Sequence, residues 1–515
     1  MPELPLLRMS ISYLTKEISS MTFVSVYFFI FVAAVLLLYF VFPLKYRWGL
    51  LLVASAFFYA TWGKRALVMI VATTALAYIA AIRIETCDVS DKRKKKLYLW
   101  TSVLMLIAFL AFCKMYNFNS WSISGFYVPL GISYYTFSII GYLVDVYARK
   151  EKAERNFLKL ALFVLFFPKI MQGPISKHRT LAPQLEKGHA FDYNQFRSGM
   201  QLMLWGYFKK LMIADRIAIA TEKVFGNVSG YGGAVFVASV ILLGIQAYCD
   251  FSGYMDIARG FCEAIGIDLD ENFRRPFFAK SAAEFWRRWH ISLGTWFKDY
   301  IYMPIVISPK LIKTSGILRQ RCGKRVGKAL MTIVPSAVVW FLTGLWHGTG
   351  AGYLAWGLWW GTLIIFSEVF ASEITKLNRL LHINTEAPSW NVFRMVRTYG
   401  IFCMGLILSK PDSILDSKII LYRILKAPQI SDLMNGTLFQ LFGSTKQLLL
   451  LVVCIGILFL ASVIQEQHKV RVRDLIAQWN IVFRWGFYVA TVMLIILFGI
   501  YGPTYDMSTF EYMHY

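Results

Sequence analysis

Long apolar runs alternate with short polar breaks along most of this amino-acid sequence. The runs lie at 22–42, 49–62, 66–82, 97–112, 128–147, 235–248, 329–346, 353–370, 398–408, 448–464 and 482–501. A helix of roughly 20 apolar residues crosses a hydrocarbon core of about 30 Å. The pattern therefore predicts an all-α polytopic integral membrane protein. Residues 1–21 form a polar N-terminal segment, and 22–515 form one membrane domain.

Residues 157–281 depart from this pattern, because their apolar runs are short and are interrupted by proline, glycine and charge. Two such stretches read FFPKIMQGPISKHR and LMLWGYFKKLMIADRIAIA. One ordinary span, 235–248, separates them from the interrupted sequence that follows. Irregular backbone at membrane depth is tolerated only where protein buries it or where it lines a water-filled cavity. We therefore expect re-entrant helices and a cavity here, within a catalytic middle part of about 125–375.

Residues 281–304 are predicted to form one amphipathic helix at the membrane interface. Aromatic and aliphatic side chains recur at three- and four-residue spacing, while charged side chains take the other side. The apolar set is Phe285, Trp286, Trp289, Leu293, Trp296 and Phe297. The charged set is Arg287, Arg288, Lys298 and Asp299. A basic linker follows over 310–328, which we expect in the cytoplasm.

Composition agrees with a membrane protein and narrows the function classes. Hydrophobic residues make up 57% of 515 and charged residues 16%, against about 25% charged residues in soluble domains. The net charge of +24 indicates basic cytoplasmic loops facing anionic lipid rather than nucleic acid, because the basic clusters lie between apolar runs. The positive-inside rule then places the loops 43–48, 83–96 and 148–156 in the cytoplasm. The seven cysteines are scattered without a CxxC pair, so neither a zinc site nor a disulfide framework is indicated.

Two histidines lie where chemistry is plausible. His347 ends the apolar run 329–346, and an ionisable group at membrane depth is a candidate functional residue. His290 lies on the predicted apolar face of 281–304, four residues after Trp286. The alternative for each is a structural histidine whose ring is satisfied by a hydrogen bond.

Two aspartates in the YCDFSGYMDIARG stretch (248–260) would be costly in an apolar setting unless they are paired. Asp256 can meet Arg259 one helical turn on, and Asp250 can meet Arg287 or Arg288. We expect such pairs to hold a broken helix in place.

The combination of several motifs resembles the membrane-bound O-acyltransferase family. The motifs are LGISYYTFSIIGYLVDVY (130–147), QGPI (172–175), YCDFSGYMDIARG (248–260), ENFRRPF (271–277), FWRRWHISLGTWFKDYIYMP (285–304) and TGLWHG (343–348). Within the family, they look like the branch that O-acetylates bacterial alginate and, more distantly, the branch that D-alanylates teichoic acid.

The resemblance implies a funnel of roughly 10 to 12 transmembrane helices with re-entrant and interfacial helices. It also implies that His347, in WHG, is the catalytic residue and that His290, in WRRWH, is its polar partner. Beside them, we select as candidate substrate-binding residues Trp346, Trp289, Asp250, Tyr254 and Gln172. The resemblance itself does not assign roles to the last three of these.

The function expected from these motifs is acyl transfer from a thioester donor, acetyl-CoA or another acyl thioester, to a polysaccharide hydroxyl. We expect no bound cofactor and no metal, a multi-pass location in the cytoplasmic membrane, and no nucleic acid partner. The resemblance implies an extracytoplasmic partner, such as an SGNH-type acetyltransferase, that modifies the polysaccharide. Alternatives are D-alanyl transfer, a lipid or polysaccharide transporter, and a non-catalytic export scaffold.

Overall fold

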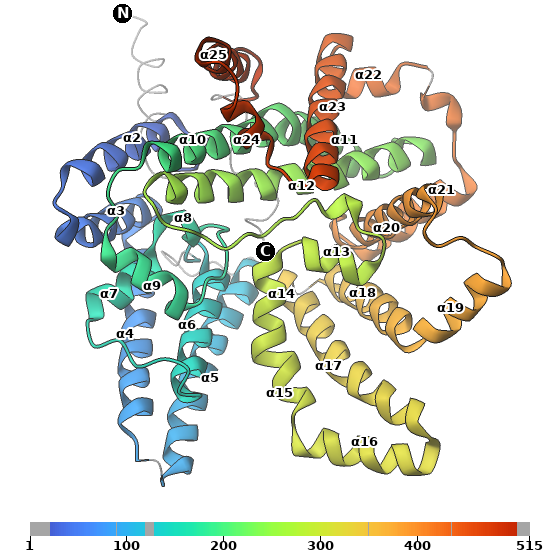
Figure 1. The fold of residues 1–515 in the computed structure, drawn as a ribbon. Helices are drawn as coiled ribbons and strands as arrows, with labels where there is room; N and C mark the ends of the chain where they lie inside the picture. The colour runs from blue at the N-terminus through green and yellow to red at the C-terminus, as the bar shows by residue number, and fades with distance from the viewer. Residues whose placement is uncertain (1–20, 89, 119–127, 349, 434, 502–515) are drawn as a thin grey trace, which may run out of the picture. The chain divides into compact units, whose positions relative to one another are not determined.

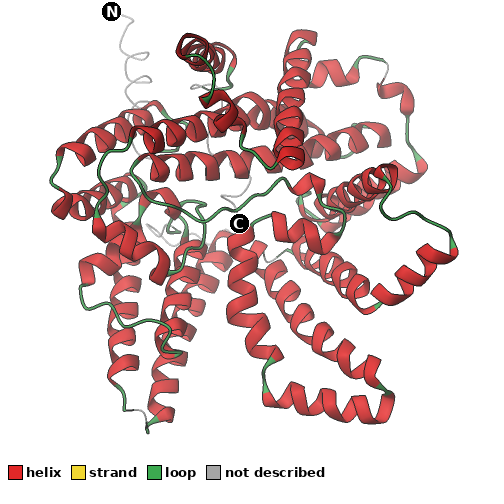
Figure 2. Ribbon diagram, in the orientation of Figure 1, coloured by secondary structure: helices red, strands yellow, loops and turns green. Residues whose placement is uncertain are grey.

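The computed structural model describes residues 21–88, 90–118, 128–348, 350–433 and 435–501, and these are almost entirely helical (Figures 1 and 2). Within these ranges, the only strand-like pairing is an isolated antiparallel bridge between Phe273 and Trp289. The all-α prediction is therefore confirmed. The predicted polar segment 1–21 lies, apart from Met21, outside the described residues.

The described residues form two compact units, and the first comprises those within 21–207 and 253–270, with residue 501. Its helices are α2 (Val26–Val41), η1 (Leu44–Tyr46), α3 (Arg47–Thr61), α4 (Lys64–Thr86), α5 (Lys92–Phe118), α6 (Ile132–Tyr147), α7 (Phe157–Leu165), α8 (Phe167–Ile170), α9 (His178–Lys187) and α10 (Tyr193–Tyr207), with the last part of α12 (Gly233–Ala264). The short α7 and α8 match the interruptions expected after residue 157.

The second unit comprises the described residues within 208–252 and 271–500, and it contains both candidate histidines. Its helices are the π-helix η2 (Phe208–Ala214), α11 (Asp215–Phe225), the first part of α12, η3 (Pro276–Phe278), α13 (Ala282–Arg288), α14 (Ile291–Phe297), the π-helix η4 (Lys298–Tyr302), α15 (Met303–Val306), α16 (Pro309–Cys322), α17 (Lys324–His347), α18 (Ala351–Val369), α19 (Ala371–Leu380), α20 (Pro388–Ser409), α21 (Ile414–Lys426), η5 (Ile430–Leu433), α22 (Thr437–Leu441), α23 (Thr445–His468), α24 (Val472–Ala477) and α25 (Ile481–Phe498).

Seven of the described helices are long and apolar enough to cross a membrane: α4, α5, α12, α17, α20, α23 and α25. The pair α18 and α19, bent by 67°, makes an eighth if it is one span. The apolar runs of the sequence predicted more membrane spans, because several of these runs form helices that are shorter than a full span. Thus α2 has 16 residues, α3 has 15 and α6 has 16.

Two basic segments predicted as loops are helical. Lys92 to Lys96 form the first turns of α5, and the Asp91 side chain accepts a hydrogen bond from the Lys94 backbone N–H at 3.1 Å. Residues 309–322 of the basic linker form α16, which begins at a Ser308 cap. Lysine and arginine are good helix formers, so a cap was sufficient to start each helix.

The aspartate-rich stretch after 248 is also not a break, because α12 runs without interruption from Gly233 to Ala264. The Lys210 ammonium lies 2.6 Å from the Asp250 carboxylate and neutralises it. A neutralised carboxylate can be buried inside a helix without breaking it.

Two glycines of α18, Gly357 and Gly361, bring α17 and α18 into close contact. A Cβ on Gly357 would lie 2.7 Å from the backbone oxygen of Trp340, and one on Gly361 would lie 3.0 Å from the Trp340 Cβ. Small residues let helix backbones approach in this way. The contact fixes the C-terminal half of α17, which carries His347.

Candidate active site

His290 lies at a sharp break between two short helices. α13 ends at Arg288, Trp289 is extended, and His290 has φ 48° and ψ 51° in the left-handed region before α14 begins at Ile291. L residues other than glycine, asparagine and aspartate adopt this region rarely and at a cost. The single helix predicted over 281–304 is therefore wrong, and His290 lies at a turn instead of on a helical face.

The break forms because the turn makes its hydrogen bonds with the preceding segment, residues 272–274. The Ile291 N–H donates to the Asn272 carbonyl at 3.1 Å, and the Ser292 N–H donates to Asn272 Oδ1 at 2.8 Å. The Arg274 N–H donates to the Arg288 carbonyl at 2.9 Å, beside the Phe273–Trp289 bridge. These contacts replace the i→i−4 bonds that a continuous helix would require.

The imidazole of His290 is buried among aromatic rings, with only 2% of the residue exposed. The Phe251 ring meets it edge to face at 4.9 Å between centroids, and the Trp346 ring lies at 5.9 Å. Burial lowers the pKa of His290 to about 3. The ring is therefore neutral at physiological pH, with one N–H donor and one acceptor nitrogen.

His347 is the last residue of α17 and is also buried. Its ring lies 4.6 Å from the Trp346 ring and 4.5 Å from the Trp356 ring of α18, both in edge-to-face arrangements. The next residue, Gly348, lies so close to Tyr353 that a Cβ would be 2.3 Å from the tyrosine ring. Gly348 therefore lets the chain turn tightly into α18 immediately after the histidine.

Trp346 is the residue that connects the two histidines, because its indole lies near both imidazoles. The sequence separates His290 and His347 by 57 positions and could not show this. A wall of further tryptophans lies beside them, in which Trp286 contacts the rings of Trp340, Trp356 and Trp360. The arrangement is a buried, aromatic environment around two polar rings.

Trp289 and Asp250 lie in the same unit but have structural partners. The Trp289 ring packs against Phe273, Phe285 and Phe402 at 5.0 to 5.5 Å. The prediction that Asp250 meets Arg288 is wrong, because Asp250 pairs with Lys210, which also lies 2.7 Å from Asp215. Arg288 pairs with Glu284 and Glu466.

The Lys210 ammonium is held between two buried carboxylates. Burial alone would lower the pKa of Lys210, but the charges of Asp215 and Asp250 outweigh it and raise that pKa above its usual value. The neighbouring Lys209 donates to the Ser252 hydroxyl at 2.8 Å. Asp250 precedes Phe251, so this ion cluster fixes the part of α12 that presents Phe251 to His290.

The remaining candidates, Tyr254 and Gln172, belong to the first unit. Tyr254 stacks on Phe23 with ring centroids 4.3 Å apart, and Gln172 is completely buried. Their substrate-binding role stays a prediction.

Sequence reasoning missed three residues that shape the histidine environment: Asn272, Phe251 and Trp356. Asn272 was within reach, because it is the uncharged polar residue of ENFRRPF, a motif that already carried the resemblance. Phe251 and Trp356 carry no signal that separates them from other core aromatics. Among the residues that the structure describes, no three His, Cys, Asp or Glu side chains gather where they could hold a metal ion.

Comparison with known proteins now adds to this geometry. The family described as MBOAT, membrane-bound O-acyltransferase, matches residues 146–318, which include the His290 turn. A probable alginate O-acetylase AlgI from Pseudomonas syringae pv. tomato is 32% identical over 405 residues, covering 76% of this chain and 72% of the relative. The chain belongs to the membrane-bound O-acyltransferase family.

Two further relatives show how substrates vary among proteins similar to this acyltransferase. A peptidoglycan O-acetyltransferase from Helicobacter pylori is 29% identical, covering 64% of this chain and 66% of the relative. A teichoic acid D-alanyltransferase from Bacillus subtilis is 28% identical, covering 54% of this chain and 67% of the relative. Membership of the family agrees with the resemblance seen in the sequence and makes the chain an acyltransferase of the membrane.

Proposed function

We propose that this protein transfers an acyl group, most simply acetyl, from a cytoplasmic thioester such as acetyl-CoA toward an extracytoplasmic polysaccharide hydroxyl. The observation that carries the proposal is the pair of buried imidazoles, His290 and His347, that share Trp346. Three relatives named for acyl transfer to cell-envelope or secreted polymers support the substrate class. The apolar helices and the membrane family support a multi-pass location, which we assign to the cytoplasmic membrane.

In the proposed step, His347 acts as the general base. It takes the proton of the attacking hydroxyl as the new C–O bond forms at the thioester carbonyl, and it returns that proton to the sulfur as the C–S bond breaks. Such catalysis contributes about 10²- to 10⁴-fold. The acyl group passes from sulfur to oxygen, so no oxidant, reductant or metal enters the balance.

His290 has the complementary role. A ring with a pKa near 3 is a poor base at neutral pH but a competent N–H donor. We assign that N–H to the negative charge that develops on the carbonyl oxygen as the hydroxyl attacks, a contact worth about 3 kcal/mol when the donor is preorganised. The left-handed turn and the Asn272 hydrogen bonds supply the preorganisation.

The partner belongs to the same proposal. We expect an SGNH-type acetyltransferase, or another polysaccharide-modifying protein outside the membrane, to complete the transfer to the polymer. The basic segments assigned to the cytoplasm, such as the start of α5, would attract the phosphates of a CoA thioester.

The test measures thioester consumption by the purified full-length protein in detergent or nanodiscs. His347→Ala and His347→Gln should reduce acetyl-CoA turnover by at least about 100-fold while thermal unfolding stays close to wild type. His382→Asn is the control, because it removes an exposed histidine from the same unit. Wild-type turnover in both His347 variants would overturn the assignment, and a wild-type protein that moves polymer without consuming thioester would indicate a transporter.

A further inference from the structure

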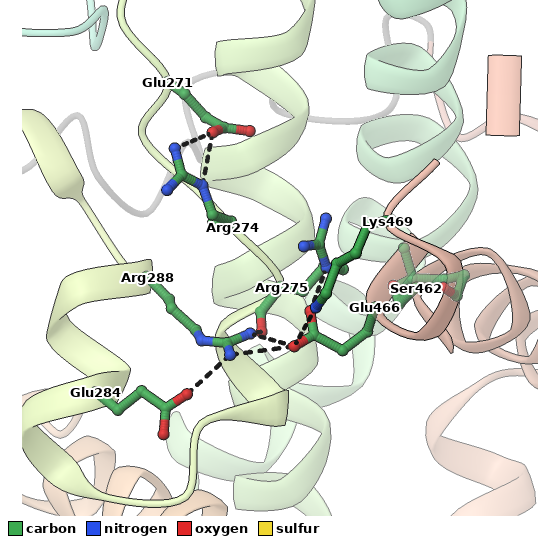
Figure 3. A network of polar contacts seen from close by, with 9 residues as sticks. Glu271, Arg274, Arg275, Glu284, Arg288, Ser462, Glu466 and Lys469 are labelled. Atoms are coloured by element: carbon green, nitrogen blue, oxygen red, sulfur yellow. Dashed lines mark hydrogen bonds and ion pairs between the residues drawn. The ribbon is translucent and has the colours of Figure 1, made fainter. Parts of the chain in front are cut away.

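The Glu466 carboxylate, near the end of α23, holds two arginines from a distant part of the chain (Figure 3). Its Oε2 accepts from Arg275 Nε at 2.6 Å, and its Oε1 accepts from both terminal nitrogens of Arg288 at 3.1 and 3.2 Å. The side chains of all three residues are partly buried, so solvent and salt screen these ion pairs less than fully exposed pairs.

The two arginines stand at one end of the short pairing that shapes the His290 turn. Phe273 pairs with Trp289, the Arg274 N–H donates to the Arg288 carbonyl, and Arg275 is the next residue along the chain. An Arg288 terminal nitrogen also reaches the Arg275 carbonyl at 3.4 Å. At the other end, Asn272 bonds to Ile291 and Ser292. The pairing is thus tied by Asn272 on the His290 side and by Glu466 on the arginine side.

Both segments contain a residue in the left-handed region. Arg275 has φ 46°, and His290 has φ 48°. Such conformations persist in non-glycine residues only where the surroundings over-determine them, and they gather at functional sites. Glu466 accepts charge-assisted hydrogen bonds, which are stronger than neutral ones, from Arg275 in one segment and from Arg288 in the other.

The local ion pairs around the network do not duplicate this role. Glu284 pairs with Arg288 from one turn away in the same helix, at 2.8 Å, so it joins no distant segments. Glu271 pairs with Arg274 within the same loop, where both side chains are exposed. Lys469 lies 3.5 Å from Glu466 and is mostly exposed. Glu466 is the carboxylate that connects both arginines to another span.

We propose that Glu466 is a positioning residue for His290. By holding Arg275 and Arg288, it keeps the turn closed and the imidazole against Phe251 and Trp346. The expected effect of Glu466 on the rate of acetyl transfer rests on the proposed function. Its expected effect on the geometry of the His290 turn does not. A span 176 positions away (466 − 290) therefore sets the geometry of the candidate oxyanion donor.

Hydrogen exchange tests the structural half of this proposal without any substrate. In full-length Glu466→Gln, which keeps the side-chain shape but loses the charge, the peptide that contains the Ile291 and Ser292 amides should exchange about tenfold faster. Peptides from α4, in the first unit, should exchange at the wild-type rate. Glu271→Gln is the matched control, because it removes a carboxylate from the same loop and should leave exchange unchanged.

Steady-state kinetics test the catalytic half. Glu466→Gln should lower kcat for acetyl transfer about 10- to 100-fold, as expected for a misplaced catalytic group, while KM for acetyl-CoA stays within about twofold. Glu466→Asp should recover part of kcat. Arg275→Gln combined with Glu466→Gln should be no worse than the more damaging single variant, because both break the same contact.

The outcomes separate this proposal from the function on which it rests. Wild-type exchange around Ile291 in Glu466→Gln overturns the positioning role, whatever the activity. Faster exchange with unchanged kcat supports the positioning role and removes His290 from the catalytic step. If the wild-type protein consumes no thioester, the proposed function fails, and the exchange experiment still decides the role of Glu466.

Discussion

The rings of His290 and Trp346 lie 5.9 Å apart, and Trp346 is the residue directly before His347. A single indole therefore places the end of the membrane helix α17 beside the turn between α13 and α14. The relationship makes His290 testable as a hydrogen-bond donor held in a strained turn.

Three substitutions at His290 separate the donor from the turn. Asparagine tolerates the left-handed region and keeps an N–H donor, so His290→Asn should lose about tenfold in acetyl-CoA turnover. Glycine adopts this region freely but has no donor, so His290→Gly should lose about 10²- to 10³-fold, as for a missing oxyanion donor. His290→Ala should lose as much activity and unfold with about 1 kcal/mol less stability than His290→Gly.

Turnover in detergent and thermal unfolding of the same preparations check this ranking. Equal activity in the asparagine and glycine variants would show that the donor is unimportant and that His290 is structural.

Acidification should destabilise the protein through His290. Its pKa is about 3 in the folded protein and near 6.5 when unfolded, so the unfolded state binds the extra proton between these values. Stability is therefore complete above about pH 6.5 and falls as pH decreases toward 3, by up to about 1.4 kcal/mol per pH unit from this group. His290→Gln, which cannot titrate, should show a shallower fall in unfolding temperature between pH 6.5 and 4.5. Parallel curves for the two proteins would mean that folding does not lower the pKa of His290.

The sequence predicted the spans best where hydropathy alone decides the structure. The run 329–346 became α17, because a backbone in lipid must satisfy its hydrogen bonds internally and a helix does so. The His290 turn was not predictable in this way, because apolar spacing continues on both sides of it. Its cause is pairing with residues 272–274 and, through Arg275 and Arg288, with Glu466. Such long-range contacts leave no periodic signal in one sequence.

Gly357 offers a test of the close packing of α17 and α18. Its Cβ would lie 2.7 Å from the Trp340 carbonyl oxygen and 3.1 Å from the Gly344 Cα, all backbone atoms that cannot move aside independently. Gly357→Ala should therefore cost about 1–3 kcal/mol of stability and reduce turnover, since Gly344 lies one turn before His347.

The control for this prediction is Gly400→Ala. Gly400 is inside α20, and a Cβ there meets nothing within 4 Å. Alanine is the better helix former by up to about 1 kcal/mol, so this variant should be neutral or slightly stabilised. Similar melting temperatures for the two glycine variants would contradict the close approach of α17 and α18.

The buried cluster of Lys210, Asp215 and Asp250 should behave as a unit whose cation is essential. Lys210→Met leaves two carboxylates that have lost their shared cation, and breaking a buried pair in this way costs about 3–5 kcal/mol. Asp250→Asn should cost less, because Lys210 keeps its 2.7 Å contact with Asp215. The triple variant Lys210→Met, Asp215→Asn, Asp250→Asn removes all three charges and should recover part of the loss. Thermal unfolding of the purified variants measures the series. Since Phe251 follows Asp250 and contacts His290, acetyl-CoA turnover should fall and recover in the same order as stability. A Lys210→Met protein as stable as wild type would show that the cluster does not hold α12 in place.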